Sequence, residues 1–393
     1  MRKHQLLLFA AVSILALPSV LAAQPRGSLR CEGGSAGPYP CRAVDQASFV
    51  PLNDLSGSPL ERGARAVLGW HHEASGREFA LVSLSTRTVI VEVTDPESPR
   101  QIGDYGSEEG GLGAMATFGD HLYAVVNRDG PKLDVFDLTR LLGAGPPAHF
   151  PADASVDLPF PGGLSINPET GYAYVFSNSV VALDLNPDPE DPEQVFVWDP
   201  GPAQPHNLEC VLYHGSDSRF LGHEICFGAA SRRSLVIYDV TDKANPVALS
   251  RTFYRPFNVP WDTALTADHR FLLLADAFDE HSPGYNTRTF LWNLSSLTAP
   301  VNFTRYDGPT RARDLDLEVR GRYAYLANAT AGLRILDLRQ IARGRVREVG
   351  SFDVEPTLNN ANWFGAHSLD VLPSGIVIVA SLRQGLFMLR PRL

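Results

Sequence analysis

Short apolar runs that end in an acidic or polar residue recur along the whole chain. Residues 133–138 read LDVFDL and residues 333–338 read LRILDL, so the two runs share their apolar positions and the position of an aspartate. The seven copies of this run occupy residues 89–93, 133–138, 180–185, 235–240, 289–294, 333–338 and 386–390. β-branched and aromatic residues favour strands, and repeats of roughly 45 to 55 residues are typical of β-propeller blades. The pattern therefore predicts an all-β chain built from repeated small sheets.

A second β-rich run precedes most copies, and turn-forming residues follow several of them. Residues 172–176 read YAYVF and residues 323–326 read YAYL. The segments after two copies, residues 94–99 (TDPESP) and 241–246 (TDKANP), contain the Asp, Asn and Pro residues that are typical of turns. Each unit is thus predicted to be an antiparallel sheet of about four strands. One such sheet cannot bury both faces, whereas seven sheets packed radially cover one another.

The two ends of the chain are predicted to close the ring together. The last repeat ends at Leu393, directly after its third strand, and residues 48–52 (SFVPL) have the composition of a strand. We therefore predict an all-β fold, a seven-bladed β-propeller closed by an N-terminal strand, in which residues 48–52 complete the last blade. The predicted organisation is a signal peptide over residues 1–23, a disulfide-stapled segment over 24–47 and the propeller over 48–393. A β-sandwich or two smaller sheet domains is the less favoured alternative, because no low-complexity linker divides the chain.

The amino-terminal segment has the pattern of an export signal. Arg2 and Lys3 precede an apolar run over residues 6–21, and small residues follow it, so cleavage is expected near Ala22 or Ala23. A membrane anchor that stays attached is the alternative, but the apolar run is short for a span of about 20 residues. No later segment of the sequence is long and apolar enough to span a bilayer. The mature chain is therefore predicted to have no membrane span and to be secreted, in an extracellular or periplasmic location.

Four cysteines follow the predicted cleavage site: Cys31, Cys41, Cys210 and Cys226. An even number of cysteines in an exported chain indicates disulfides, and three pairings are possible. The local pairing, Cys31 with Cys41 and Cys210 with Cys226, is favoured because each pair closes a short loop. Zinc binding is the alternative, and it is less favoured because the sequence has no C-x-x-C spacing.

Several segments resemble the choice-of-anchor B family. They are residues 31–41, 44–45, 209–215, 224–227, 240–250, 286–292 and 332–338, and the recurring strand itself is similar to the LVIVD repeat. The resemblance covers nearly the whole predicted mature chain and is most specific in the cysteine-bearing segments. It implies an exported β-propeller and no settled biochemical activity. Relatives differ in their C-terminal surface anchors, and the end at Leu393 without such an anchor leads us to expect a released or periplasmic form.

The resemblance also implies His and Asp residues just before several innermost strands, where they would face the central channel. This sequence keeps part of that pattern, at residues 206–209 and 313–314. The residues predicted to form a binding site at the channel mouth are His206, Glu209, Trp261, Asp262, Asp314, Asp316 and His367. Their carboxylate and imidazole groups suit a divalent metal ion such as calcium, manganese or zinc. The favoured alternative is that they are turn and strand-start residues hydrogen-bonded to the blade backbone, because ligand spacing across blades is not diagnostic.

No catalytic residue is predicted, and the sequence favours a function without catalysis. The chain has no G-x-S-x-G motif, and residues 223–227 begin like H-E-x-x-H but lack the second histidine. The formal net charge of −10 opposes contact with phosphate backbones, so no nucleic-acid partner is expected. The five tryptophans are expected to pack between blades rather than to form a sugar platform, although Trp261 and Trp363 lie in loop-like contexts.

The predicted function is a binding or scaffold module for a protein or carbohydrate ligand outside the cytoplasm. The alternative is a metal-dependent hydrolase or lactonase with its site at the propeller axis, since propellers host both classes.

Overall fold

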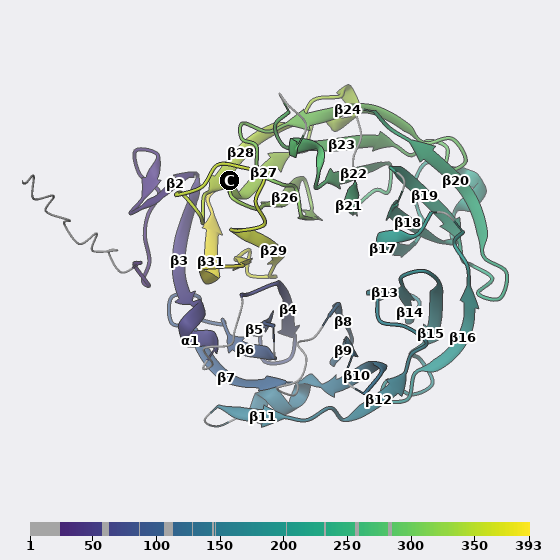
Figure 1. Ribbon diagram of the computed structural model, residues 1–393, viewed down its shortest axis with the longest axis horizontal. Coiled ribbons are helices and arrows are strands. Elements are labelled where there is room, and N and C mark those ends of the chain that lie inside the picture. The colour runs from purple at the N-terminus through teal and green to yellow at the C-terminus, as the bar shows by residue number, and fades with distance from the viewer. Residues whose placement is uncertain are drawn as a thin grey trace, which may run out of the picture.

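The computed structural model describes residues 24–56, 63–85, 87–105, 113–127, 129–143, 145, 147–201, 203–231, 233–255, 259–281 and 285–393. In these residues, seven sheets stand radially around a central axis, as Figure 1 shows. The chain is therefore an all-β propeller with seven blades, as the repeats predict. The predicted signal peptide, residues 1–23, lies outside the described residues.

Each blade has four main antiparallel strands, and the innermost strand lies next to the axis (Figure 1). From the innermost strand outwards, blades 1 to 4 are β4 (Ala66–His72), β5 (Arg77–Ser83), β6 (Thr88–Glu92) and β7 (Arg100–Tyr105); β8 (Met115–Phe118), β9 (His121–Asn127), β10 (Pro131–Asp137) and β12 (Ala154–Asp157); β13 (Gly163–Asn167), β14 (Tyr172–Phe176), β15 (Val180–Asp184) and β16 (Glu193–Trp198); and β17 (Pro205–Leu212), β18 (Glu224–Ala230), β19 (Ser234–Asp239) and β20 (Val247–Phe253). Blades 5 to 7 are β21 (Pro260–Leu265), β22 (Phe271–Asp276), β23 (Arg288–Asn293) and β24 (Val301–Asp307); β25 (Asp316–Arg320), β26 (Tyr323–Asn328), β27 (Gly332–Asp337) and β28 (Arg347–Phe352); and β29 (Ala366–Val371), β30 (Val377–Ser381), β31 (Gly385–Pro391) and β3 (Val44–Pro51).

Short additional elements lie at the edges of the blades. Strand β11 (Ala148–Phe150) pairs with β7, and strands β1 (Ser35–Ala36) and β2 (Tyr39–Arg42) extend blade 6. The helical elements are α1 (Leu52–Ser56) and the 3-10 turns η1 (Leu138–Gly143), η2 (Ser218–Phe220), η3 (Asp279–His281) and η4 (Ile341–Arg343). No helix in the described ranges has the length and apolar character that a membrane crossing requires.

The recurring apolar run is the third strand of every blade. In blade 4, β19 is buried at each position before Asp239, which is partly exposed. The carboxylate of Asp239 accepts the N–H of Thr241 at 3.0 Å and so begins the turn to the outer strand. Asp137 and Asp337 accept the N–H two residues later in the same way, at 2.8 and 2.9 Å. The aspartate of the repeat is thus a turn residue, which explains its position near the end of the runs that contain it.

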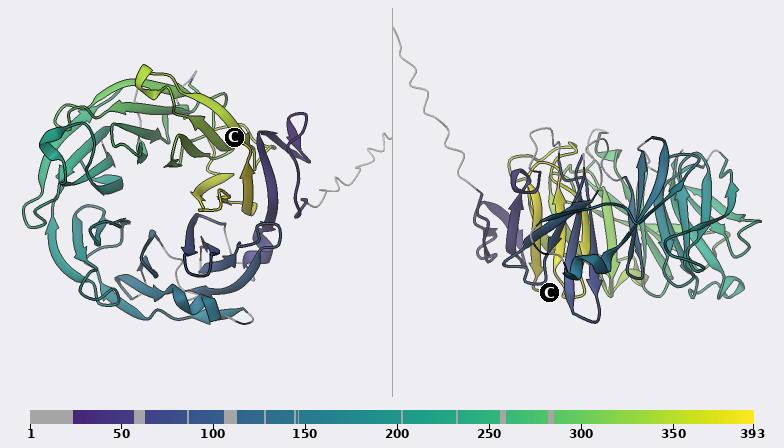
Figure 2. Two further views of the ribbon diagram at one scale, coloured as in Figure 1. Left: turned by 180° about the vertical axis from the view of Figure 1, so that it is seen from behind. Right: turned by 90° about the horizontal axis from the view of Figure 1, so that it is seen from below.

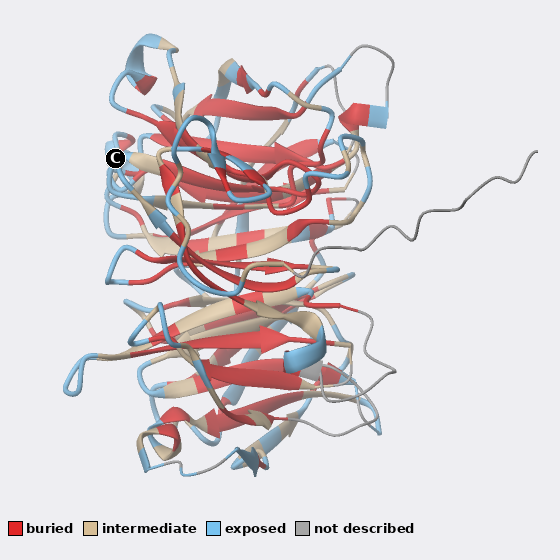
Figure 3. Ribbon diagram, turned by 90° about the vertical axis from the view of Figure 1, so that its left-hand side faces the viewer, coloured by how far each residue is buried: buried red, intermediate tan, exposed pale blue. Residues whose placement is uncertain are grey.

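The hydrophobic cores lie between neighbouring blades. Phe227 and Ile237 of blade 4 pack in one cluster with Leu274 and Trp292 of blade 5. Figure 3 shows strands that are largely buried and connections that are exposed. Each sheet therefore covers a face of the next, which a single blade could not do for itself.

The ring is closed by β3, which pairs with β31 in an antiparallel register. Phe49 faces Phe387 across this pair, with ring centroids 4.4 Å apart. Figures 1 and 2 show purple β3 beside yellow β31 on the wall of the ring. The closing strand predicted over residues 48–52 is longer on its amino-terminal side, because a register shift between Gln46 and Ser48 lets the pairing continue back to Val44.

The disulfide between Cys31 and Cys41 staples the segment that leads into this strand. Strand β2 of the stapled segment pairs with β28 of blade 6. Tyr39, only 1% exposed, packs its ring 5.3 Å from Phe352 of blade 6 and 5.5 Å from Phe387 of blade 7. The amino-terminal segment therefore joins the blades on both sides of the closure.

The second disulfide joins Cys210 and Cys226, which face each other on β17 and β18. Both cysteines are buried. The local pairing predicted for the four cysteines is thus confirmed. Two structural disulfides are typical of proteins outside the cytoplasm.

Candidate functional site

Three innermost strands carry a β-bulge at the same place, close to where each strand begins. In blade 4 the register with the second strand shifts between Pro205 and Asn207, so His206 is the extra residue. The same shift occurs around Trp261 in blade 5 and around His367 in blade 7. A bulge re-aims the side chain of its extra residue, and bulges are frequent next to functional sites. His206, Trp261 and His367 all line one cavity of about 650 Å³ in the central channel.

These three rings belong to a larger group that we call the aromatic rim. The rim consists of His206, Trp261, Phe278, His281, Trp363 and His367. The ring of Trp261 stacks on His206 at 5.8 Å and lies 5.4 Å from the ring of Trp363. Both indole rings are only partly buried. These are the two tryptophans that the sequence places in loop-like contexts, and both pack against the buried cluster of Ala277, Leu315 and Ala329.

Arg313 supports the rim from behind. Its guanidinium carbon lies 4.1 Å from the ring centroid of Trp363 and 4.5 Å from that of Phe278. It donates hydrogen bonds to the carbonyls of Ala361 at 2.8 Å and Ala277 at 2.5 Å, and it contacts the ring nitrogen of His281. Since Arg313 is 3% exposed, its cation–π contacts are desolvated and hold the rings in place.

The channel carboxylates bind the main chain of the next blade. Glu209 accepts the N–H of Leu265 at 3.1 Å, and Asp262 accepts the N–H of Leu317 at 2.9 Å. The same contact joins Asp316 to Leu369 at 2.9 Å, Glu318 to Val371 at 2.9 Å and Asp370 to Gly69 at 2.7 Å. An innermost strand is a sheet edge, so its outward N–H groups need acceptors from elsewhere. These carboxylates supply them and tie the inner ends of blades 4 to 7 and blade 1 together.

Burial changes the protonation of these groups. It raises the pKa of Glu209 to about 8, and burial with the nearby charge of Asp370 raises the pKa of Glu318 to about 8. Burial and the charge of Asp316 raise the pKa of Asp262 well above its usual range. Burial also lowers the pKa of His206. Near neutral pH the site therefore offers neutral imidazole and carboxylic acid groups that can donate and accept hydrogen bonds.

Asp314 does not line the channel. It is fully buried, and its carboxylate accepts hydrogen bonds from the Thr289 hydroxyl of blade 5 and from the Asn328 amide of blade 6, the latter at 2.7 Å. Asp314 was expected at the channel mouth because residues 313–314 keep part of the pattern that the family resemblance implies. It precedes β25, however, and its side chain enters the space between two blades.

A pair of buried acids lies behind the rim on η3, between Phe278 and His281. Asp279 and Glu280 are 1% and 0% exposed. Asp279 accepts a hydrogen bond from Arg288 at 2.5 Å. Burial, opposed in Asp279 by Arg288, raises the pKa of Asp279 to about 7 and that of Glu280 to about 10. The short turn that carries two rim residues is thus tied to β23 by the contact of Asp279 with Arg288, and burial favours the protonated form of both acids.

The predicted site residues are therefore brought together in all but one case. His206, Trp261, Asp262, Asp316 and His367 line the 650 Å³ cavity, and Glu209 lines an adjoining cavity of about 430 Å³ with Asp262 and Asp316. Sequence reasoning missed Phe278 and His281, because they come from a connection outside the repeat. It noted residues 313–314 but did not include Arg313 among the site residues. It also missed Glu318 and Asp370, although Glu318 follows Asp316 at the two-residue spacing of one strand face. In the part of the chain that the structure describes, no three His, Cys, Asp or Glu side chains are grouped to hold a metal ion.

Comparison with known proteins shows the fold. No protein-family model matches the chain, and no curated protein matches it significantly. A solved chain of hydrazine synthase from Kuenenia stuttgartiensis superimposes with a TM-score of 0.57, over 82% of this chain and 95% of that chain. The two sequences are 12% identical, so the similarity concerns the β-propeller architecture alone.

Proposed function

We propose that this protein is a binding module that acts outside the cytoplasm and that its ligand binds on the aromatic rim. The observation that carries the proposal is the set of three equivalent bulges, which turn His206, Trp261 and His367 toward one cavity. A bulge interrupts the ladder of main-chain hydrogen bonds. Its benefit is therefore the new orientation that it gives to a side chain. The rim is also fixed in advance by Arg313, which lowers the cost of ordering side chains on binding.

Three features together support a location outside the cytoplasm. The chain has two disulfides, an amino-terminal segment with the pattern of a signal peptide, and cysteine-bearing segments similar to the choice-of-anchor B family. We infer that the protein is a secreted member of that family, in an extracellular or periplasmic location. Its disulfides then keep the ring closure and blade 4 intact in an oxidising environment.

A carbohydrate is the ligand class that suits the rim. The partly exposed faces of Trp261 and Trp363 can cover the apolar face of a sugar ring. The polar groups next to them are uncharged imidazoles and carboxyl groups with raised pKa, which can bond to hydroxyl groups without a counterion. A cavity of about 650 Å³ has the size of pockets for small ligands.

The test is a glycan array followed by calorimetric titration of the best glycan. Trp261→Ala should weaken binding by about tenfold or more, because it removes one stacking surface from the rim. Phe253→Ala is the matched control, since Phe253 is a 60% exposed aromatic residue on the outer strand β20. It should leave the affinity unchanged.

Two outcomes would overturn the proposal. One is the absence of any bound glycan, or binding that Trp261→Ala leaves intact. The other is turnover of an ester, lactone or glycoside that requires a stoichiometric metal ion and is lost in Asp262→Ala, which would establish the hydrolase instead.

A further inference from the structure

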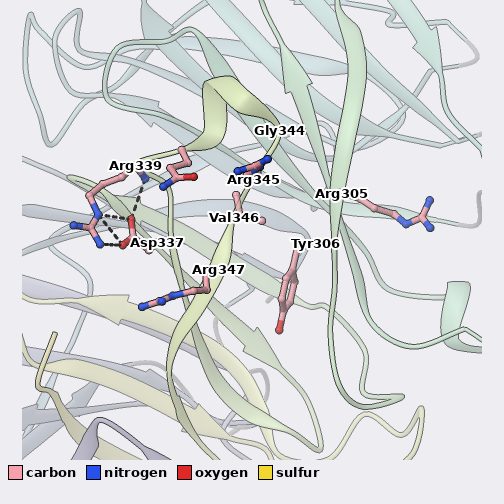
Figure 4. Close-up of a pocket in the computed structure, with 9 residues that line it drawn as sticks. Arg305, Tyr306, Asp337, Arg339, Gly344, Arg345, Val346 and Arg347 are labelled. Atoms are coloured by element: carbon pink, nitrogen blue, oxygen red, sulfur yellow. Dashed lines mark hydrogen bonds and ion pairs between the residues drawn. The ribbon is translucent and has the colours of Figure 1, made fainter.

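A second cavity lies on the outer wall, where the connection between β27 and β28 of blade 6 meets β24 of blade 5. Its volume is about 510 Å³. Figure 4 draws its lining residues, which are Arg305, Tyr306, Asp337, Arg339, Gln340, Gly344, Arg345, Val346 and Arg347. None of them lines the cavity at the rim, so an inference from this cavity does not depend on the proposed function.

A left-handed glycine shapes the connection. The 3-10 turn η4 ends at Gly344, which has a φ of +68° and donates its N–H to the carbonyl of Ile341 at 2.8 Å. A side chain at this position would be strained, so the tight turn requires glycine. The turn folds the chain back so that Arg339 before it and Arg345 after it line the same cavity.

The cavity has more positive than negative charge, although the whole chain carries a formal net charge of −10. Arg339 forms an ion pair with Asp337 at 2.5 Å. Arg345 and Arg347 are exposed and form no ion pair with any described residue. The guanidinium groups of Arg339, Arg345 and Arg347 therefore line the cavity together with a single carboxylate, that of Asp337. The remaining arginine, Arg305, pairs with Asp307 at 2.8 Å and points away from the others in Figure 4.

In blade 1, the arginine at the position equivalent to Arg347 is neutralised by a glutamate. Arg100 is the first residue of β7 and faces Glu92, just as Arg347 is the first residue of β28 and faces Asp337. Arg100 forms an ion pair with Glu92 at 2.6 Å. In blade 6 the facing acid is bound by Arg339 instead, so Arg347 keeps a free guanidinium at the edge of the cavity.

We propose that this cavity binds an oxyanion, that is, the phosphate, sulfate or carboxylate group of a small ligand. Guanidinium groups present parallel N–H donors that match the spacing of oxyanion oxygens, and such charge-assisted bonds are about twice as strong as neutral ones. Arg345 and Arg347 supply the charge, and Arg339, oriented by Asp337, supplies further donors. The Gln340 side chain adds an amide donor. Tyr306 lines the cavity with its ring and offers no hydrogen bond to the ligand, because its hydroxyl already donates to Glu348.

The test is calorimetric titration at low ionic strength with three probes: inorganic phosphate, inorganic sulfate and citrate. At least one probe should bind with one-to-one stoichiometry, and binding should weaken as sodium chloride is added. Arg347→Gln and Arg345→Gln should each weaken binding by about tenfold. Arg100→Gln makes the same change in net charge at the equivalent position of blade 1 and should have no effect.

The preference among the probes separates phosphate or sulfate recognition from carboxylate recognition. Because Arg345 and Arg347 are exposed, thermal melts of their variants should match that of the unsubstituted protein, and either variant serves if the other fails to fold. Absence of binding by all three probes would overturn the proposal. So would equal weakening by Arg100→Gln, since that result would indicate general attraction to the surface.

Discussion

Asp314→Asn removes one ionisable group from the interior between blades 5 and 6. Asp314 is fully buried, and burial raises its pKa from 3.8 to about 8, against the effect of its bond from Thr289. A carboxyl group whose pKa rises on folding holds its proton more tightly in the folded state. The stability that this proton contributes is present at low pH and is lost as the pH rises from the unfolded pKa toward about 8. Asparagine keeps an oxygen for the Asn328 amide and stays neutral at every pH.

The expected magnitude follows from about 1.4 kcal/mol per pKa unit. Between pH 5 and pH 8, the free energy of unfolding of the unsubstituted protein should fall by about 4 kcal/mol relative to that of Asp314→Asn. Urea denaturation of both proteins at several pH values measures this difference. Asp157→Asn, the same chemical change on an exposed side chain, is the control. Curves that stay parallel from pH 5 to pH 8 would refute the reasoning, because Asp314 would then be ionised in the folded state and would require a cation beside it.

Three further predictions concern the ring. Deleting residues 24–51 removes β3 and leaves the edge of β31 bare, so size-exclusion chromatography should show aggregation; a monomer with an unchanged melt would contradict the role of β3. Replacing Cys210 and Cys226 with serine removes a disulfide between residues 16 apart in sequence and should lower the free energy of unfolding by about 3 kcal/mol. An unchanged urea midpoint would contradict a stabilising role of this disulfide. Asp370→Leu leaves the N–H of Gly69 without its acceptor at 2.7 Å and should cost about 2 kcal/mol in urea denaturation, while Asp370→Asn keeps an oxygen and should cost less; equal losses would show that the bond is unimportant.

The sequence was most informative for strands with a uniform environment. The third strands are buried on both faces, so runs such as residues 235–238 are continuously apolar and easy to recognise. The innermost strands are short and mix polar and apolar positions, as in β25 (DLEVR), because one side faces the channel. Their carboxylates accept main-chain hydrogen bonds from the next blade. This role depends on contacts between repeats, which a local sequence pattern does not encode.

The candidate site was predictable where it lies on strands and unpredictable where it lies on connections. His206, Trp261 and His367 stand at the start of innermost strands, and this regular position identified them. Phe278 reaches the rim from a connection whose path depends on buried acids. Asp314 was misplaced because two residues of chain at a strand entrance are enough to turn a side chain from the channel into the space between blades.

The closing pair has a consequence for how the molecule folds. Phe49 and Phe387 meet although nearly the whole polypeptide lies between them in sequence. Bringing such distant segments together carries an entropy cost on the order of 5 kcal/mol, which only the finished ladder and its core repay. Synthesis delivers β3 before all the other main strands of the seven blades and β31 after them, so β3 has no partner in its blade until β31 has been made. The pairing of β3 with β31 is therefore the last step of folding, and a molecule that binds either strand beforehand prevents closure of the ring.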